Sequence, residues 1–225
     1  MAIDPEKCCV IIGAYNEAEN IEKVLNDLIK TNFKIVVIDD GSTDSTVNLI
    51  DDSRVYLLQH QLNCGQGAAL QTGIEFARKN PQIEVFITMD SDGQHQIEDI
   101  YPLIEPIVEK KVDVVFGSRF LDKRTKLSLI RRIVLKAAVK FSKLSTGLPL
   151  SDAHNGLRAF SREVIFEINL QRDGMTHATE IIEIVSEKKL SYQEVAVEIL
   201  YPKFMYKKGQ SLWNSINILS DLFFK

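Results

Sequence analysis

The most constraining feature of this sequence is the alternation of short apolar runs with amphipathic segments across its first 117 residues. The apolar runs are typical of buried strands, and the segments between them carry apolar residues at helical spacing. Such alternation predicts right-handed βαβ units, and hence an α/β fold with a mainly parallel sheet flanked by helices. We expect strands at residues 8–14, 34–38, 55–59, 83–89 and 112–117. We expect helices at residues 17–30, 65–79 and 97–110, and one capped by Ser42, Thr43 and Asp44 that ends at Asp51.

The second half of the chain departs from this rhythm. The pattern predicts a long amphipathic helix at 126–144, a polar segment and then a strand in "DAHNGLRAFS", a helix at 176–188 and a strand at 192–200. The last stretch, "YKKGQSLWNSINILSDLFFK", predicts an amphipathic helix. We find no internal repeat and no low-complexity linker, so we expect a single domain over residues 1–225, divided into halves at 8–119 and 120–225.

Composition places the chain among soluble globular proteins, because 45% of its residues are hydrophobic and 26% are charged. Two of its three cysteines, Cys8 and Cys9, are adjacent in an apolar run, which indicates reduced thiols and a cytoplasmic protein. The first residues show no secretory leader. The longest run without Asp, Glu, Lys or Arg, residues 55–74, contains four Gln, an Asn and a His, so we expect no membrane span.

Charge is unevenly distributed along the chain. Residues 119–143 contain nine Lys or Arg against a single acid, Asp122, although the whole chain carries a formal charge of −4. A local basic block in an acidic protein predicts an anionic partner at that place. The alternative is an ordinary solvated helix face. Nucleic acid is not expected as the partner, because the rest of the chain is acidic and repels phosphate backbones.

Polar side chains follow all five predicted strands of the first half. Because the carboxyl ends of parallel strands meet at one edge of a sheet, ligands of such folds bind there. Turn chemistry could explain each polar group alone, but it explains the complete set poorly. The polar residues are Tyr15, Asn16, Glu17, Asp39, Asp40, Asn63, Asp90, Asp92, Ser118 and Arg119, and Gly41 and Gly65 accompany them.

The fourth strand ends in two closely spaced carboxylates, Asp90 and Asp92, in the sequence "MDSDGQH". Like charges a few ångström apart disfavour joint ionisation. Either water solvates the pair, as in an ordinary Asp-Gly turn, or a cation lies between them.

Five segments, "AYNEAENI", "VIDDGSTDST", "NCGQGAAL", "MDSDGQH" and "GSR", occur in an order and spacing that resemble the family 2 glycosyltransferases with the GT-A fold. The closest likeness is to the dolichyl- or polyprenyl-phosphate sugar synthases, over residues 8–211. The sequence departs from that pattern at Gly13, where relatives have Pro, at Leu157, where they have Phe, and at Tyr206, where they often have Arg.

The resemblance implies a nucleotide-sugar site in residues 8–119 for a UDP- or GDP-linked donor. Tyr15 and Glu17 would lie beside the base and ribose, and Asp40 would read the base. It also implies Mg²⁺ or Mn²⁺ as the cofactor, with Asp90, Asp92 and Gln94 as the metal site. The implied donor-binding residues are Ala14, Tyr15, Glu17, Asp39, Asp40, Gly65, Gly67, Asp90 and Ser91.

The second half, residues 120–225, would then face the acceptor. The implied acceptor-binding residues are Arg119, Arg158, Lys207, Lys208 and Ser211. The implied catalytic residues are Asp92, Arg119, Asp152 and Glu180. An acceptor hydroxyl would need Asp152 or Glu180 as a general base, whereas an acceptor phosphate is already ionised and needs none.

We therefore predict a metal-dependent, inverting glycosyltransferase that acts on a lipid-linked acceptor such as polyprenyl phosphate, or on a glycan or glycolipid hydroxyl. It would work in the cytoplasm at the inner face of the membrane, with the basic helix docked on the membrane. That helix would otherwise pack internally or form a homodimer. The alternative functions are a sugar-1-phosphate nucleotidyltransferase and a non-catalytic nucleotide-sugar-binding module.

Overall fold

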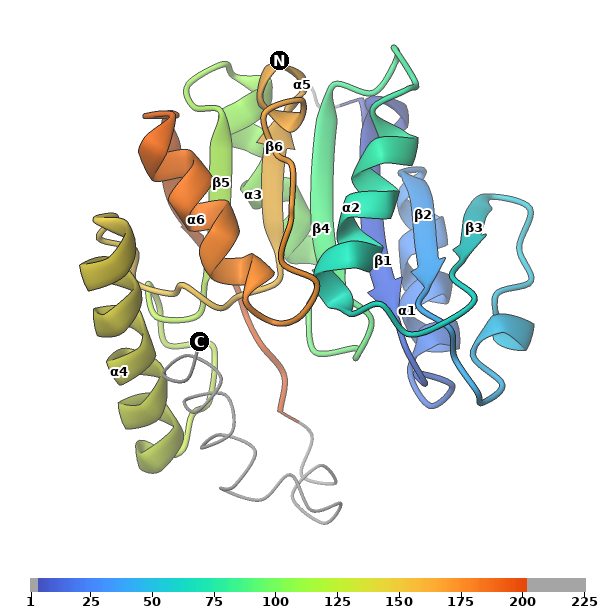
Figure 1. Ribbon diagram of the computed structural model, residues 1–225, viewed down its shortest axis with the longest axis horizontal. Coiled ribbons are helices and arrows are strands. Elements are labelled where there is room, and N and C mark those ends of the chain that lie inside the picture. The colour runs from blue at the N-terminus through green and yellow to red at the C-terminus, as the bar shows by residue number, and fades with distance from the viewer. Residues whose placement is uncertain (1–3, 202–225) are drawn as a thin grey trace.

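A computed structural model describes residues 4–201, apart from the side chains of residues 130 and 141 (Figure 1). Seven strands form one sheet in the order β3-β2-β1-β4-β6-β5-β7. The strands are β1 (Cys8–Ala14), β2 (Lys34–Asp39), β3 (Val55–Gln59), β4 (Val85–Asp90), β5 (Val114–Ser118), β6 (Arg158–Ser161) and β7 (Tyr192–Ala196). The α-helices are α1 (Ile21–Leu28), α2 (Gln66–Ala77), α3 (Ile100–Val108), α4 (Leu129–Thr146), α5 (Arg162–Ile165) and α6 (His177–Glu187).

The sheet is mainly parallel, as predicted. Strand β1 pairs in parallel with β2 and β4, β2 pairs in parallel with β3, and β5 pairs in parallel with β7. Strand β6, from the second half of the chain, is antiparallel to both of its neighbours, β4 and β5. It thus separates two strands that are consecutive in the first half.

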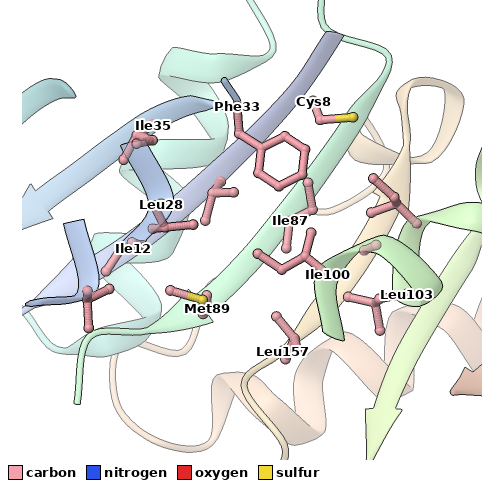
Figure 2. Packing of buried hydrophobic residues seen from close by; sticks show 14 of the residues in the cluster. Cys8, Ile12, Leu28, Phe33, Ile35, Ile87, Met89, Ile100, Leu103 and Leu157 are labelled. Carbon is pink, nitrogen blue, oxygen red and sulfur yellow. The ribbon is translucent and has the colours of Figure 1, made fainter. Parts of the chain in front are cut away.

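The sheet has helices on both faces, with α2 and α6 on one side and α1 and α3 on the other (Figure 1). Strands buried on both faces require near-continuous apolar runs, and β1 supplies one. Its Ile12 belongs to the apolar cluster that also contains Leu28 of α1 and Leu103 of α3 (Figure 2), whereas Ile11 belongs to the cluster on the opposite face, with Ile74 of α2. Two apolar layers therefore fix the sheet and the strand ends.

Helix α4 lies beside α6 and away from the strands (Figure 1). The Ser128 hydroxyl accepts a hydrogen bond from the Arg131 amide at its start, and Gly147 ends it in the left-handed conformation, with φ 76°. Among the described residues, no helix is long and apolar enough to cross a membrane. The predicted C-terminal helix, with Lys207, Lys208 and Ser211, lies outside the described residues.

The helix predicted to follow Ser42 is wrong, because only a single 3-10 turn, Val47–Leu49, forms there. Its expected capping groups are used in long-range contacts. The Asp44 carboxylate accepts a hydrogen bond from the Ala18 amide, at 3.2 Å, and the Asn16 side chain accepts one from the Thr43 amide, at 2.8 Å. These bonds join the loops that follow β1 and β2.

Contacts of the same kind explain why α1 begins later than the predicted residue 17. The Glu17 amide donates to the Thr46 hydroxyl, at 2.8 Å, so residues 17–20 belong to a loop and the helix begins at Ile21. The strand predicted at 192–200 is shorter in the structure. β7 ends at Ala196, because the residues that follow run to the loop after β4. There the Leu200 amide donates to the Gln94 carbonyl, at 2.9 Å.

Candidate active site

A cavity of about 470 Å³ opens where β1, β2 and β4 end. Its walls come from the loops after these strands, the start of α2, the segment that leads into β6, and the start of α6. The cavity therefore lies at the edge of the sheet predicted from the polar residues. The predicted residues that line it are Ala14, Tyr15, Glu17, Asp40, Asn63, Gly65, Asp90, Ser91, Asp92 and Arg158.

Asp90 is held in the ionised form. The Gln66 amide donates to one carboxylate oxygen, at 2.8 Å, and His95 Nε2 lies 3.2 Å from the other. Burial opposes ionisation, but the contacts with His95, the charge of Arg158 and the bond from Gln66 outweigh it and lower the pKa of Asp90 to about 2.

Asp92 and Glu17 have the opposite electrostatic environment. Burial, followed by the charge of Asp90, raises the pKa of Asp92. Burial also raises the pKa of Glu17, and the charges of Asp92 and Asp90 add to that effect. Three carboxylates thus face one cavity and repel one another, an arrangement that a divalent cation with oxygen ligands relieves. The residues present fit Mg²⁺ or Mn²⁺.

Gln94 orients Asp92. Its backbone amide donates to Asp92 Oδ1, at 3.0 Å, and its side-chain amide donates to Asp92 Oδ2, at 2.5 Å. A partner of this kind fixes the rotamer of a metal-binding carboxylate. The structure thus places Gln94 behind the predicted metal ligand.

Asp40 lines the cavity, but its oxygens already have protein partners. They accept hydrogen bonds from the amides of Cys64 and Gly65, at 2.9 and 2.7 Å, and His60 Nδ1 lies at 2.7 Å. Asp40 therefore holds the loop before α2 in place. One atom each of Asp40, His60 and Cys64 lie within 4.8 Å of one another, and this group also has the composition of a metal site.

Asp39, which was also predicted to bind the donor, is buried and is not among the residues that line the cavity. One of its oxygens accepts from the Ser42 amide, at 3.2 Å, and the other has no hydrogen-bond partner in the part of the chain that the structure describes.

Arg119 and Asp152 form a buried ion pair, with Arg119 Nε 2.6 Å from Asp152 Oδ2. A second Arg119 nitrogen donates to the Tyr201 hydroxyl, at 2.7 Å. The Arg131 guanidinium, from α4, lies over the ring of Tyr201 at 3.8 Å from its centroid. Two arginines thus flank one tyrosine next to α4.

Glu180 fastens a loop that forms one wall of the cavity. Its two oxygens accept hydrogen bonds from the amides of Gln171 and Arg172, at 2.8 and 3.0 Å. This loop lies close against Gly67, where a Cβ atom would be 2.0 Å from the Arg172 carbonyl oxygen. Glu180 and Gly67 therefore shape the cavity without lining it.

The family model described as glycosyl transferase family 2 matches residues 9–168. The chain belongs to this family. The UDP-N-acetylglucosamine–dolichyl-phosphate N-acetylglucosaminyltransferase of Methanococcus voltae is 28% identical, over 95% of this chain and 93% of its own. The polyprenol monophosphomannose synthase of Mycolicibacterium smegmatis is 32% identical, over 73% of this chain and 65% of its own.

Among solved structures, the glucosyl-3-phosphoglycerate synthase of Mycobacterium tuberculosis in complex with Mn²⁺ and UDP-glucose superposes with a TM-score of 0.65. The two chains are 18% identical, and the match covers 89% of this chain and 73% of that one. The predicted GT-A fold is confirmed, and so is the assignment of this enzyme to the family 2 glycosyltransferases.

The cavity also contains residues that were not among the predicted site residues. Gln66 bonds to Asp90, His154 lines the cavity although it was expected to be an ordinary polar loop residue, and Gly156 lies so close to Asp90 that a Cβ atom would be 2.3 Å from a carboxylate oxygen. His177, a histidine that the sequence suggested for the site, lines the cavity as well. Gln66, His154 and Gly156 belong to the motifs "NCGQGAAL" and "DAHNGLRAF". The motifs alone do not show which of their members face the ligand, because that depends on the path of the backbone.

Proposed function

We propose that this glycosyltransferase transfers a sugar from a UDP- or GDP-linked donor to a polyprenyl-type lipid phosphate, with inversion at the anomeric carbon. The observation that carries the proposal is the group of three mutually repelling carboxylates, Glu17, Asp90 and Asp92, in one cavity at the sheet edge. Such a group suits a metal-bound diphosphate.

Asp90 and Asp92 would hold the metal, and Gln94 and Gln66 would keep their carboxylates in position. When bound, Mg²⁺ or Mn²⁺ would neutralise negative charge on the leaving diphosphate. Tyr15, Glu17 and the loop fastened by Asp40 would enclose the nucleoside.

A lipid phosphate is favoured over a hydroxyl acceptor because both predicted bases are occupied. Asp152 is paired with Arg119, and Glu180 accepts two backbone amides. A phosphate oxygen is already ionised and can attack the anomeric carbon without a base. Arg131, which lies over Tyr201, supplies positive charge where such an acceptor would arrive, and Arg119 holds the Tyr201 hydroxyl from the other side. The names of the two lipid-phosphate glycosyltransferases among the relatives agree with this choice.

The same acceptor would bring the enzyme to the inner face of the membrane, through α4. Leu129 and Ile133 of this helix are 74% and 60% exposed. Arg132, Lys136 and Lys140 are exposed on the same helix. Exposed apolar groups among basic ones are typical of a helix that lies in an anionic interface.

The proposal is tested by sugar transfer. Purified enzyme would be incubated with Mn²⁺, short-chain polyprenyl phosphate, and radiolabelled UDP- or GDP-sugars, and the lipid product extracted. We expect label in the lipid fraction with one nucleotide series, and none in the presence of chelator. Transfer to a polyprenol or a glycan, but not to the phosphate, would overturn the acceptor assignment. Full activity with chelator would overturn the metal assignment.

A further inference from the structure

Arg158 is a buried charge that forms no ion pair with the residues that the structure describes. It begins β6, is 1% exposed, and lines the cavity, yet its two terminal nitrogens have no hydrogen-bond partner in the described part of the chain. A guanidinium remains charged and offers five N–H donors in a fixed geometry. Burying such a group without acceptors costs free energy, and native structures rarely leave it so.

The carboxylates that act on Arg158 are engaged elsewhere. Asp90 accepts from Gln66 and lies against His95, and Asp152 is paired with Arg119. Burial therefore dominates over the charges of Asp90 and Asp152, and it lowers the pKa of Arg158 to about 10. Within the described residues, the N–H donors of this side chain are thus available to a bound ligand.

The neighbouring His177 offers the complementary group. It lines the same cavity at the start of α6, and its Nδ1 lies 2.8 Å from the Gly174 carbonyl oxygen. Burial, followed by the charge of Arg158, lowers the pKa of His177 to about 4, so the ring is neutral at pH 7. Because Nδ1 must donate to that carbonyl, Nε2 carries a lone pair and can accept a hydrogen bond.

The order of the strands shows which end of the cavity this pair occupies. Asp40 follows β2, Asp90 ends β4 and Arg158 begins β6, in the sheet order β2-β1-β4-β6. Arg158 therefore lies beyond the metal-binding carboxylates, on the side away from the nucleoside end. A donor that spans the cavity would place its sugar and the adjoining phosphate there.

We propose that Arg158 binds an anionic oxygen at the sugar end of the donor, and that His177 accepts a hydrogen bond from a sugar hydroxyl. This inference rests on the proposed function and assigns Arg158 to the donor, not to the acceptor. The anionic oxygen belongs either to the phosphate next to the sugar or to a carboxylate on the sugar. Both groups offer oxygen atoms that can accept hydrogen bonds from the N–H groups of the Arg158 guanidinium.

The test compares Arg158→Met with the wild type and with Arg172→Met, which removes an exposed arginine from the adjacent loop. Calorimetry with Mn²⁺ would measure binding of UMP, UDP, UDP-glucose and UDP-glucuronate, and of the guanosine series. We expect Arg158→Met to bind the monophosphate like the wild type and to lose at least about tenfold in affinity for one diphosphate class, the scale of a charge-assisted bond. Weaker binding of all the diphosphates would identify the phosphate next to the sugar as the group that Arg158 binds. Weaker binding of UDP-glucuronate alone would identify the carboxylate of the sugar.

Thermal unfolding without ligand separates binding from architecture. We expect Arg158→Met to melt no lower than the wild type, because an unpaired buried charge has been removed. Unchanged affinity for every ligand would overturn the inference and leave the proposed function standing. A lower melting temperature with an unchanged ratio of diphosphate to monophosphate affinity would make Arg158 structural. A wild type that binds no nucleoside diphosphate would reject both.

Discussion

Asp92 is a carboxyl group whose charge the folded protein disfavours. Burial and the charge of Asp90 raise its pKa above the ordinary value of about 3.9. A carboxyl whose pKa rises on folding contributes stability that is present at low pH and is lost as the pH rises through the raised value. At neutral pH the free protein therefore carries a strained carboxylate pair, which a bound cation would relieve.

Replacing Asp92 with Asn should consequently raise the melting temperature of the ligand-free protein at pH 7 and abolish Mn²⁺-dependent nucleotide binding. The exposed carboxylate Asp51, changed to Asn, is the matched control and should alter neither property. Thermal shift with and without Mn²⁺ and nucleotide measures both. A Mn²⁺ response in Asp92→Asn equal to that of the wild type would remove Asp92 from the metal site.

Acidification gives a second residue-level prediction. Metal binding needs ionised Asp92, so Mn²⁺-dependent nucleotide affinity in the wild type should fall as the pH drops through the raised pKa of Asp92, above the ordinary range of aspartate. Asp90, with a pKa of about 2, stays ionised over that interval. Calorimetry as a function of pH would show the loss, and affinity that stays constant down to about pH 4 would contradict it.

Glu180 tests whether a buried carboxylate positions a loop or acts as a base. Because it accepts two backbone amides, Glu180→Ala should lower the free energy of unfolding by about 1–3 kcal/mol and weaken donor binding. Chemical denaturation measures this, with exposed Glu187→Ala on the same helix as the control. A large loss of turnover at unchanged stability and donor affinity would instead identify a base.

At the scale of elements, α4 has the clearest features of a membrane-binding surface. Arg131 is engaged with Tyr201, so the residues free to meet a membrane are the exposed Arg132, Lys136, Lys140 and Lys143. Each basic residue close to anionic lipid contributes on the order of 1 kcal/mol. Four such residues, with Leu129 and Ile133, could hold the enzyme reversibly on a bilayer.

Wild-type enzyme should therefore float with phosphatidylglycerol vesicles at low salt and be released at high salt, because salt screens surface charge. Changing the four basic residues of α4 to Gln should leave the enzyme in solution. The matched control changes Lys110, Lys111, Lys188 and Lys189 to Gln, since these are also exposed but lie in the turns that follow α3 and α6. Sedimentation of the wild type as a dimer, without flotation, would assign the exposed face of α4 to a second copy.

Elements that depend on local periodicity were predictable, and those that depend on distant partners were not. The five strands of the first half match their apolar runs because burial on both faces requires such runs. The helix expected after Ser42 failed because Asp44 and Asn16 bond across loops that only the folded chain brings together. The roles of Asp40 and Glu180 were equally hidden, since hydrogen bonds from distant backbone amides define them.

At the scale of the whole molecule, the two halves share one sheet. Strands β4 and β5 meet only through β6, which residues 158–161 supply. A fragment that ends at residue 125 should therefore fail to fold, because it leaves β4 and β5 with unpaired edges. Circular dichroism during thermal denaturation would show no cooperative transition, whereas the full chain melts cooperatively. A sharp transition in the fragment would mean that residues 8–119 form a unit of their own.

The position of β6 also constrains how enzymes of this type can be recombined. Gly156 and Arg158 line the cavity but follow α4 in the sequence, so the segment that contains that helix interrupts the residues of the proposed donor site. A chimera designed to pair the proposed donor site with a foreign acceptor region should keep residues through 180, because His177 lines the cavity and Glu180 holds one of its walls, and should treat 120–150 as a separable insert. A crossover placed at residue 119 would exchange Gly156, Arg158 and His177, and with them part of the cavity, together with the proposed acceptor side.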